Sequence, residues 1–100
     1  MLFAFEKASS NIRKNDKAII VEGYFDVISL HAKGINNSVA SLGTALNKYQ
    51  ISQLCRCTDN KNIILNFDSD NAGILATKRV IKEVESLSLH DQINLKILQL

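Results

Sequence analysis

The sequence predicts an α/β fold in which a compact parallel sheet of four strands is flanked by helices. Two observations support this prediction. Short, largely β-branched runs alternate with longer segments whose apolar residues have helical spacing, and neither kind occurs twice in succession. Such alternation implies right-handed crossovers between parallel strands. A length of 100 residues with 46% hydrophobic content suits a single domain over residues 1–100.

The first half of the chain contains two predicted helices and two predicted strands. Residues 3–14 have apolar side chains at helical spacing and a polar remainder, as in a surface helix. Residues 18–22, AIIVE, are continuous and β-branched, as in a strand covered on both faces. The following helix ends at Gly34, because glycine accepts positive φ without a side-chain clash. Residues 37–42 form a strand of weaker pattern.

The second half continues the same alternation. Asn47 is a candidate N-cap for the third helix. The side chains expected to point inward from that helix are Tyr49, Ile51, Leu54 and Cys55. A buried strand over residues 62–67, a long helix over 71–87 and a fourth strand over 93–100 complete the sheet. A final buried strand with no covering element after it suggests a piece of a longer protein.

Composition argues against a membrane-bound or secreted protein. The longest apolar cluster has only a few members, far short of the roughly 20 residues of a membrane-spanning helix. The amino-terminal MLFAFEKASS does not have the pattern of a secretion signal. Cys55 and Cys57 are poorly placed for a structural disulfide, and His31 and His90 are too distant in sequence for a local zinc motif. We expect a cytoplasmic protein with reduced thiols and no membrane partner.

Three acidic residues follow two of the predicted strands. Glu22 ends the first strand, and Asp68 and Asp70 follow the third. If these strands are neighbours, their carboxyl ends meet at one edge, where parallel sheets bind ligands. Residues i and i+2 of extended backbone face the same way, so two carboxylates lie side by side and either raise a pKa or hold a cation. Hard oxygen ligands suit Mg²⁺ or Mn²⁺, and such a site supports phosphoryl transfer.

Each acid also has a structural interpretation. Asp70 precedes a helix and is a good N-cap, a role compatible with metal binding. Asp26 lies in the first turn of the second predicted helix, where the helix dipole favours an acid and a structural role is preferred. Glu22 alone before a glycine indicates little. The coincidence of three acids at two strand ends is what favours a metal site.

Net charge adds a weaker indication. The value of +2 comes from 12 basic and 10 acidic residues and does not by itself predict a nucleic-acid partner. If Glu22, Asp26, Asp68 and Asp70 form one site, the rest of the chain has six acidic residues and 12 basic ones. That balance fits a cation site that handles a polyanion, and it equally fits ordinary solvated helix faces.

Three segments together resemble the Toprim domain of bacterial DnaG-type primases. They are IIVEGYFDVISLHAKGI, VASLGTAL and FDSDNAGILATKRV. The family pattern is a strand ending in Glu-Gly-Tyr-x-Asp, then Val-Ala-x-x-Gly-Thr-Ala-Leu, then Phe-Asp-x-Asp-x-Ala-Gly. The match extends from Leu2 to Leu100 in order and spacing, and three motifs in series are specific.

The resemblance implies a Toprim fold and roles for single residues. Glu22 matches the family's glutamate, a metal ligand or acid/base participant, and Asp68 and Asp70 match its metal-binding pair. With Mg²⁺ or Mn²⁺, these acids would join ribonucleoside triphosphates into an RNA primer on a single-stranded DNA template. A replicative helicase would bind through regions outside this chain. The positions that match supporting members of the site are Asp26, Gly43, Thr44 and Arg79.

Two departures from the primase pattern bear on activity. Ser69 stands where primases commonly have glycine, so a positive φ at that position would strain it. The primase segment Leu-Pro-x-Gly-x-Asp-Pro-Asp, which carries further metal-binding acids, would follow Leu100. The fragment alone is therefore expected to bind metal weakly and to synthesise little or no RNA.

Two alternative functions remain open from the sequence. A Toprim nuclease or topoisomerase fragment shares the glutamate and the aspartate pair but should lack the Gly-Thr-Ala-Leu segment. A magnesium-binding receiver-like signalling module also gathers acids at strand ends, but it needs a lysine at the end of a fifth strand, and the pattern predicts four strands.

Overall fold

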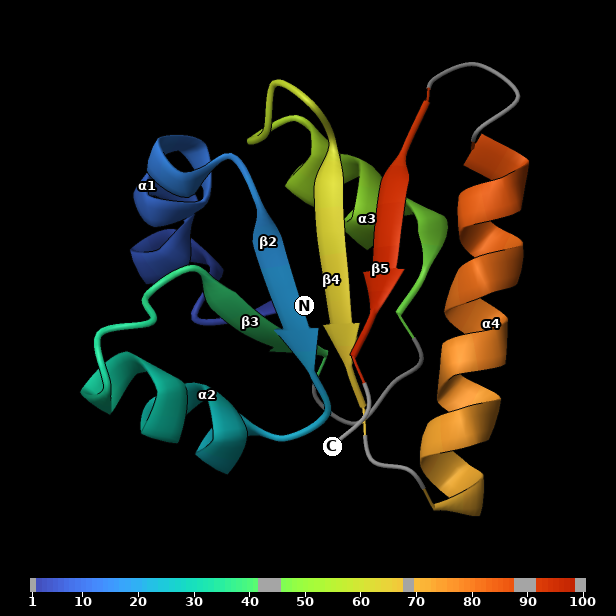
Figure 1. Cartoon of the computed structure of the whole chain (residues 1–100), viewed down its shortest axis with the longest axis horizontal. Helices are drawn as coiled ribbons and strands as arrows, with labels where there is room; N and C mark the ends of the chain where they lie inside the picture. The colour runs from blue at the N-terminus through green and yellow to red at the C-terminus, as the bar shows by residue number, and fades with distance from the viewer. Residues whose placement is uncertain (1, 42–45, 68–69, 88–91, 99–100) are drawn as a thin grey trace.

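The computed structural model describes residues 2–41, 46–67, 70–87 and 92–98. Within these ranges the chain forms a five-stranded sheet and four helices (Figure 1). The elements, in chain order, are β1 (Leu2–Phe3), α1 (Phe5–Asn15), β2 (Ala18–Val21), α2 (Tyr24–Ala32), β3 (Ser38–Ser41), α3 (Lys48–Cys55), β4 (Asn62–Asn66), α4 (Asn71–Leu87) and β5 (Asn94–Ile97).

The strand order is β1-β3-β2-β4-β5. β3, β2, β4 and β5 are parallel, which confirms the predicted four-stranded parallel sheet. The fifth strand is a correction, because residues 2 and 3 pair antiparallel with β3 instead of starting the first helix. Ala4, at φ 68°, turns the chain into α1, and the side chain of Leu2 is buried. Two residues are too few for a strand period to show in the sequence.

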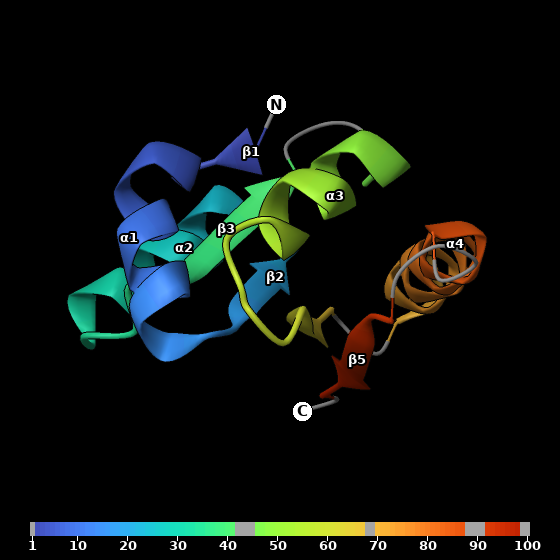
Figure 2. The same ribbon diagram turned by 90° about the horizontal axis from the view of Figure 1, so that it is seen from above.

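Two buried clusters lie on the two faces of the sheet. Ile20 and Leu65, both 0% exposed, belong to a cluster that also contains buried side chains of α1, α3 and α4. Val21 and Ala40 belong to the second cluster with Val27 of α2. Figure 2 shows α3 and α4 on one side of the sheet and α2 on the other. This arrangement is the α/β layering that the sequence predicts.

Helix ends follow the local sequence closely. The Asn47 side chain accepts a hydrogen bond from the Gln50 backbone N–H at 2.9 Å, and the Gln50 side chain accepts one from the Asn47 N–H at 3.1 Å. This reciprocal capping box confirms Asn47 as the N-cap of α3. Gly34, at φ 87°, follows the end of α2 as predicted.

Two predictions about burial are wrong. Tyr49 is 74% exposed, whereas Ile51, Leu54 and Cys55 are buried. Residues two apart on a helix lie on nearly opposite sides, so Tyr49 and Ile51 cannot both point inward. The last strand is also shorter than 93–100 and largely exposed, with Ile97 at 43%. β5 lies at one end of the strand order, so it pairs with β4 alone.

Cys55 and Cys57 are both buried, and they are not joined in a disulfide. In the part of the chain that the structure describes, no helix has the length and apolar character needed to cross a membrane.

Asp16 joins three loops at the amino ends of the strands. Its carboxylate accepts hydrogen bonds from the Asp59 N–H (2.6 Å) and from the side chain and N–H of Asn60. Its carbonyl oxygen accepts one from the Asn62 side chain, and Asn94 donates to the carbonyl of Asn60. The Asn60 side chain, followed by the two backbone N–H groups, holds the pKa of Asp16 below its ordinary value of 3.8.

We expect the substitution Leu65→Ala to test the core. Leu65 is fully buried in the middle of the sheet, so its truncation should lower the free energy of unfolding by about 2–5 kcal/mol. Leu75→Ala removes the same atoms at a 55% exposed position and should cost about 0.5 kcal/mol or less. Urea unfolding of both variants measures the difference, and equal costs would contradict the placement of Leu65.

We expect acid to weaken the Asp16 network. Because the folded pKa lies below the ordinary value of 3.8, the stabilisation is present above that pH and is lost as the pH falls through the folded pKa. Asp16→Asn should lower the urea midpoint at neutral pH and flatten its fall in acid. Asp59→Asn keeps the donated backbone N–H and is the control. An unchanged pH profile in Asp16→Asn would contradict this role.

Candidate active site

Glu22 lies directly after β2, where the chain bends toward α2. The residue is half-buried, and its Oε1 atom is buried from solvent. The strand itself carries Glu22 to this position, because Ala18, Ile20 and Val21 are buried and anchor it in the sheet. Taking a charged carboxylate partly out of water costs free energy unless other groups offset the lost hydration. The position of Glu22 is therefore a candidate for a functional role.

The pairing of β2 with β4 determines what lies beside Glu22. The two strands are parallel neighbours, with Val21 opposite Asn66. The residues that follow Val21 and those that follow Asn66 therefore leave the sheet at the same edge. Figure 1 shows the arrowheads of β2 and β4 pointing to that edge, where α2 and α4 begin. The condition for a shared acidic site, that the two strands be neighbours, is confirmed.

Asp70 is the N-cap of α4. Its Oδ1 accepts a hydrogen bond from the Gly73 N–H at 2.8 Å, and its carbonyl oxygen accepts one from Ile74 at 2.9 Å. The side chain is exposed. Because a carboxylate has two oxygens and several acceptor positions, a cap of this kind is compatible with a second role as a metal ligand.

Asp26 lies in the first turn of α2 and is exposed. Its Oδ2 lies 3.4 Å from the position that a Cβ on Gly23 would occupy, so the carboxylate turns back toward the β2–α2 bend. The helix dipole favours an acid in this place. Asp26 therefore has a structural reason for its position, and its carboxylate lies near the glycine that follows Glu22.

The remaining predicted site residues fall into two groups. Asp68, Gly43 and Thr44 lie outside the described residues, as does Ser69. Arg79 is exposed on α4, more than two helical turns beyond Asp70, so it does not lie at the strand ends.

The donor set fits a hard divalent cation. Glu22, Asp26 and Asp70 supply carboxylate oxygens at one edge, with no histidine or thiolate among them, which suits Mg²⁺ or Mn²⁺. Among the residues with described positions, no three acidic, histidine or cysteine side chains form a cluster that would hold a metal. Asp68, one of the three predicted ligands, is outside that set.

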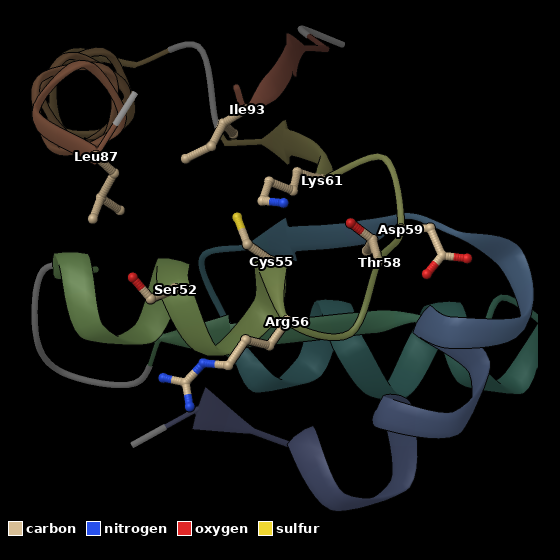
Figure 3. A pocket seen from close by; sticks show the side chains of 8 residues that line it. All are labelled: Ser52, Cys55, Arg56, Thr58, Asp59, Lys61, Leu87 and Ile93. Atoms are coloured by element: carbon tan, nitrogen blue, oxygen red, sulfur yellow. The ribbon is translucent and has the colours of Figure 1, made fainter. Parts of the chain in front are cut away.

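A separate cavity of about 600 Å³ lies at the opposite edge, among α3, the end of α4 and the start of β5. Figure 3 shows Ser52, Cys55, Lys61, Leu87 and Ile93 around it. The sequence does not predict this cavity, because its walls come from segments that no shared motif links. It contains none of the predicted site residues.

The chain matches the family model described as Toprim-like over residues 19–99. It is 51% identical over 100 residues to a DNA primase of Synechococcus elongatus and 52% identical over 99 residues to one of Synechocystis. These matches cover 100% and 99% of this chain but only 14% and 16% of the two relatives.

Solved structures give the same result. A DNA primase domain from Pseudomonas aeruginosa superimposes with a TM-score of 0.87 at 37% identity, covering 99% of this chain and 30% of that one. The Aquifex aeolicus primase, with its zinc-binding and RNA polymerase domains, gives 0.85 at 36% identity, with coverage of 99% and 23%. A DnaG primase catalytic domain bound to ssDNA gives 0.86 at 32% identity, with coverage of 100% and 31%.

The chain belongs to the Toprim-like family. Within that family it is a Toprim domain of the DnaG primase type, as its relatives and structural neighbours agree.

Two substitutions at Asp70 separate its charge from its cap. Asp70→Ala removes the hydrogen bond to Gly73 and should lower the free energy of unfolding by about 1 kcal/mol. Asp70→Asn keeps a good capping side chain and should cost only a few tenths. Thermal or urea unfolding checks both. If the two variants lose the same stability, the cap contributes nothing beyond the charge.

Proposed function

We propose that this domain carries part of the metal-dependent active site of a DNA primase, an RNA polymerase that synthesises primers for DNA replication in the cytoplasm. The observation that supports this most is the parallel pairing of β2 with β4, which aligns Glu22 with the chain that continues into the Asp68 and Asp70 motif. The similar DnaG primase catalytic domain bound to ssDNA supports a single-stranded DNA template. Ribonucleoside triphosphates and the growing RNA primer are the other substrates in this proposal.

In this proposal Glu22, Asp68 and Asp70 would hold Mg²⁺ or Mn²⁺. The cation, when bound, supplies positive charge that neutralises phosphate oxygens. In the reaction, the 3′-hydroxyl oxygen of the primer loses its proton to water and bonds to the α-phosphorus of the incoming triphosphate. The bond from that phosphorus to the β-phosphate oxygen breaks, and pyrophosphate leaves. The protein's part is to orient these groups and to present its carboxylates at the strand ends.

The helix N-termini at the same edge favour this chemistry. α2 and α4 both begin there, and their backbone N–H groups and dipoles favour negative charge nearby. Triphosphate and carboxylates are both anionic, so the edge stabilises both. The domain alone is expected to have little polymerase activity, because the relatives are far longer than this chain. A helicase partner would bind outside this domain.

Metal titration tests the proposal directly. Mn²⁺ binding to the chain, followed by water proton relaxation, should weaken at least tenfold in Asp68→Asn and in Glu22→Gln, since each loses one charged ligand. Asp16→Asn makes the same chemical change at the opposite edge and should leave the affinity unchanged. The matching substitutions in the full-length Synechococcus elongatus primase should abolish primer synthesis. Unchanged Mn²⁺ affinity in both ligand variants would overturn the metal assignment.

A further inference from the structure

An exposed tyrosine and two lysines lie together where α3 and α4 approach each other. Asn47, Lys48 and Tyr49 at the start of α3 line a cavity of about 440 Å³ with Lys82, Glu83 and Ser86 of α4. We call this region the Tyr49 surface. It is distinct from the strand ends and from the 600 Å³ cavity, with which it shares no lining residue.

The ring of Tyr49 is accessible from solvent. It is 74% exposed, although it lies in a helix whose neighbours Gln50 and Ile51 are buried. The Nζ atom of Lys48 lies 5.6 Å from the ring centroid, in cation–π range. A ring has two faces, so this contact leaves one for another planar group.

Basic side chains extend from the Tyr49 surface along α4. Lys78 and Arg79 precede Lys82 by four and three residues, so the three are neighbours on the helix, and all three are exposed. Glu83 is half-buried and is the acid that lines the cavity. From Lys82 through Arg79 to Lys78, these basic residues run toward the amino end of α4. Lys82 lies about 18 Å along the helix from Asp70. The basic residues therefore lead from the tyrosine toward the candidate active site.

We propose that the Tyr49 surface binds a single strand of nucleic acid, with one base stacked on Tyr49 and phosphates beside Lys48, Lys82 and Arg79. Charge complementarity and an exposed ring are the two features that sequence-tolerant binding of single strands requires. The inference rests on the proposed function and deepens it, because a strand held here would extend from the polymerase site at the other end of α4. It also gives Arg79 a role away from the strand ends, as a phosphate contact.

Oligonucleotide binding by the chain tests this surface. Fluorescence anisotropy with labelled oligo(dT) and oligo(U), at low salt and in EDTA, measures strand binding without any metal. Tyr49→Ala should weaken binding about tenfold, whereas Tyr49→Phe should retain it, because stacking needs only the ring. Phe25→Ala removes an equally exposed ring from α2 and is the matched control. The two oligonucleotides show whether DNA or RNA is preferred.

Salt dependence gives a second, independent readout. Lys82→Ala should reduce the slope of log affinity against log salt by about 0.7, the value for one phosphate contact on a single strand. Lys33→Ala removes an exposed lysine beyond α2 and should leave the slope unchanged. No binding by the unmodified chain, or equal binding by Tyr49→Ala, would overturn the proposal. Because EDTA is present, neither outcome depends on whether the metal assignment is correct.

Discussion

The parallel pairing of β2 with β4 is the constraint on which the rest of the molecule depends. It places Val21 opposite Asn66, residues that are 45 positions apart in the chain. The two strands are central in the sheet, and their inward side chains, among them Ile20 and Leu65, are fully buried. A slip of one residue would turn these side chains to the opposite face. The hydrophobic core therefore fixes the register, and the register fixes which acids meet at the edge.

Hydrogen bonds link the loops at the opposite edge of the sheet. The carboxylate of Asp16 accepts hydrogen bonds from the loop before β4, and Asn94 at the start of β5 donates one to the same loop. On the other side of β2, the Asn37 side chain donates to the carbonyl of Lys17. Amide and carboxylate side chains can satisfy loop backbone groups that the strands leave unpaired. One edge is thus fixed by its own polar network, while the carboxyl edge carries Glu22, Asp26 and Asp70.

The sequence predicted the parallel sheet and its helices because burial imposes a period on long elements. It could not predict β1, whose two residues are defined by pairing with β3 and not by a pattern of their own. Tyr49 was misjudged for another reason. Apolar residues at i and i+2 were both assigned to the core, and only the helix geometry shows that one of them must face outward.

The candidate site could be predicted from the sequence only in part. The alternation of elements implied a parallel sheet with helices on its faces, but it left open whether the two strands that carry the acids are neighbours. The strand order of the structure makes them so. The position of Asp70 as a cap also followed from its place before a helix. The Tyr49 surface was not predictable, because Lys82 and Tyr49 belong to different helices and no local spacing relates them.

Acids at the strand ends are tolerated because the fold offsets part of their repulsion before any cation binds. Asp70 accepts an N–H of the first turn of α4, and Asp26 lies in the first turn of α2. Each acid is therefore stabilised by a helix N-terminus, where negative charge is favoured by up to about 1 kcal/mol at exposed positions. Glu22 differs, since it follows a strand and is half-buried. Among Glu22, Asp26 and Asp70, Glu22 is thus the acid that lies outside the first turn of a helix, and it is the least exposed of the three.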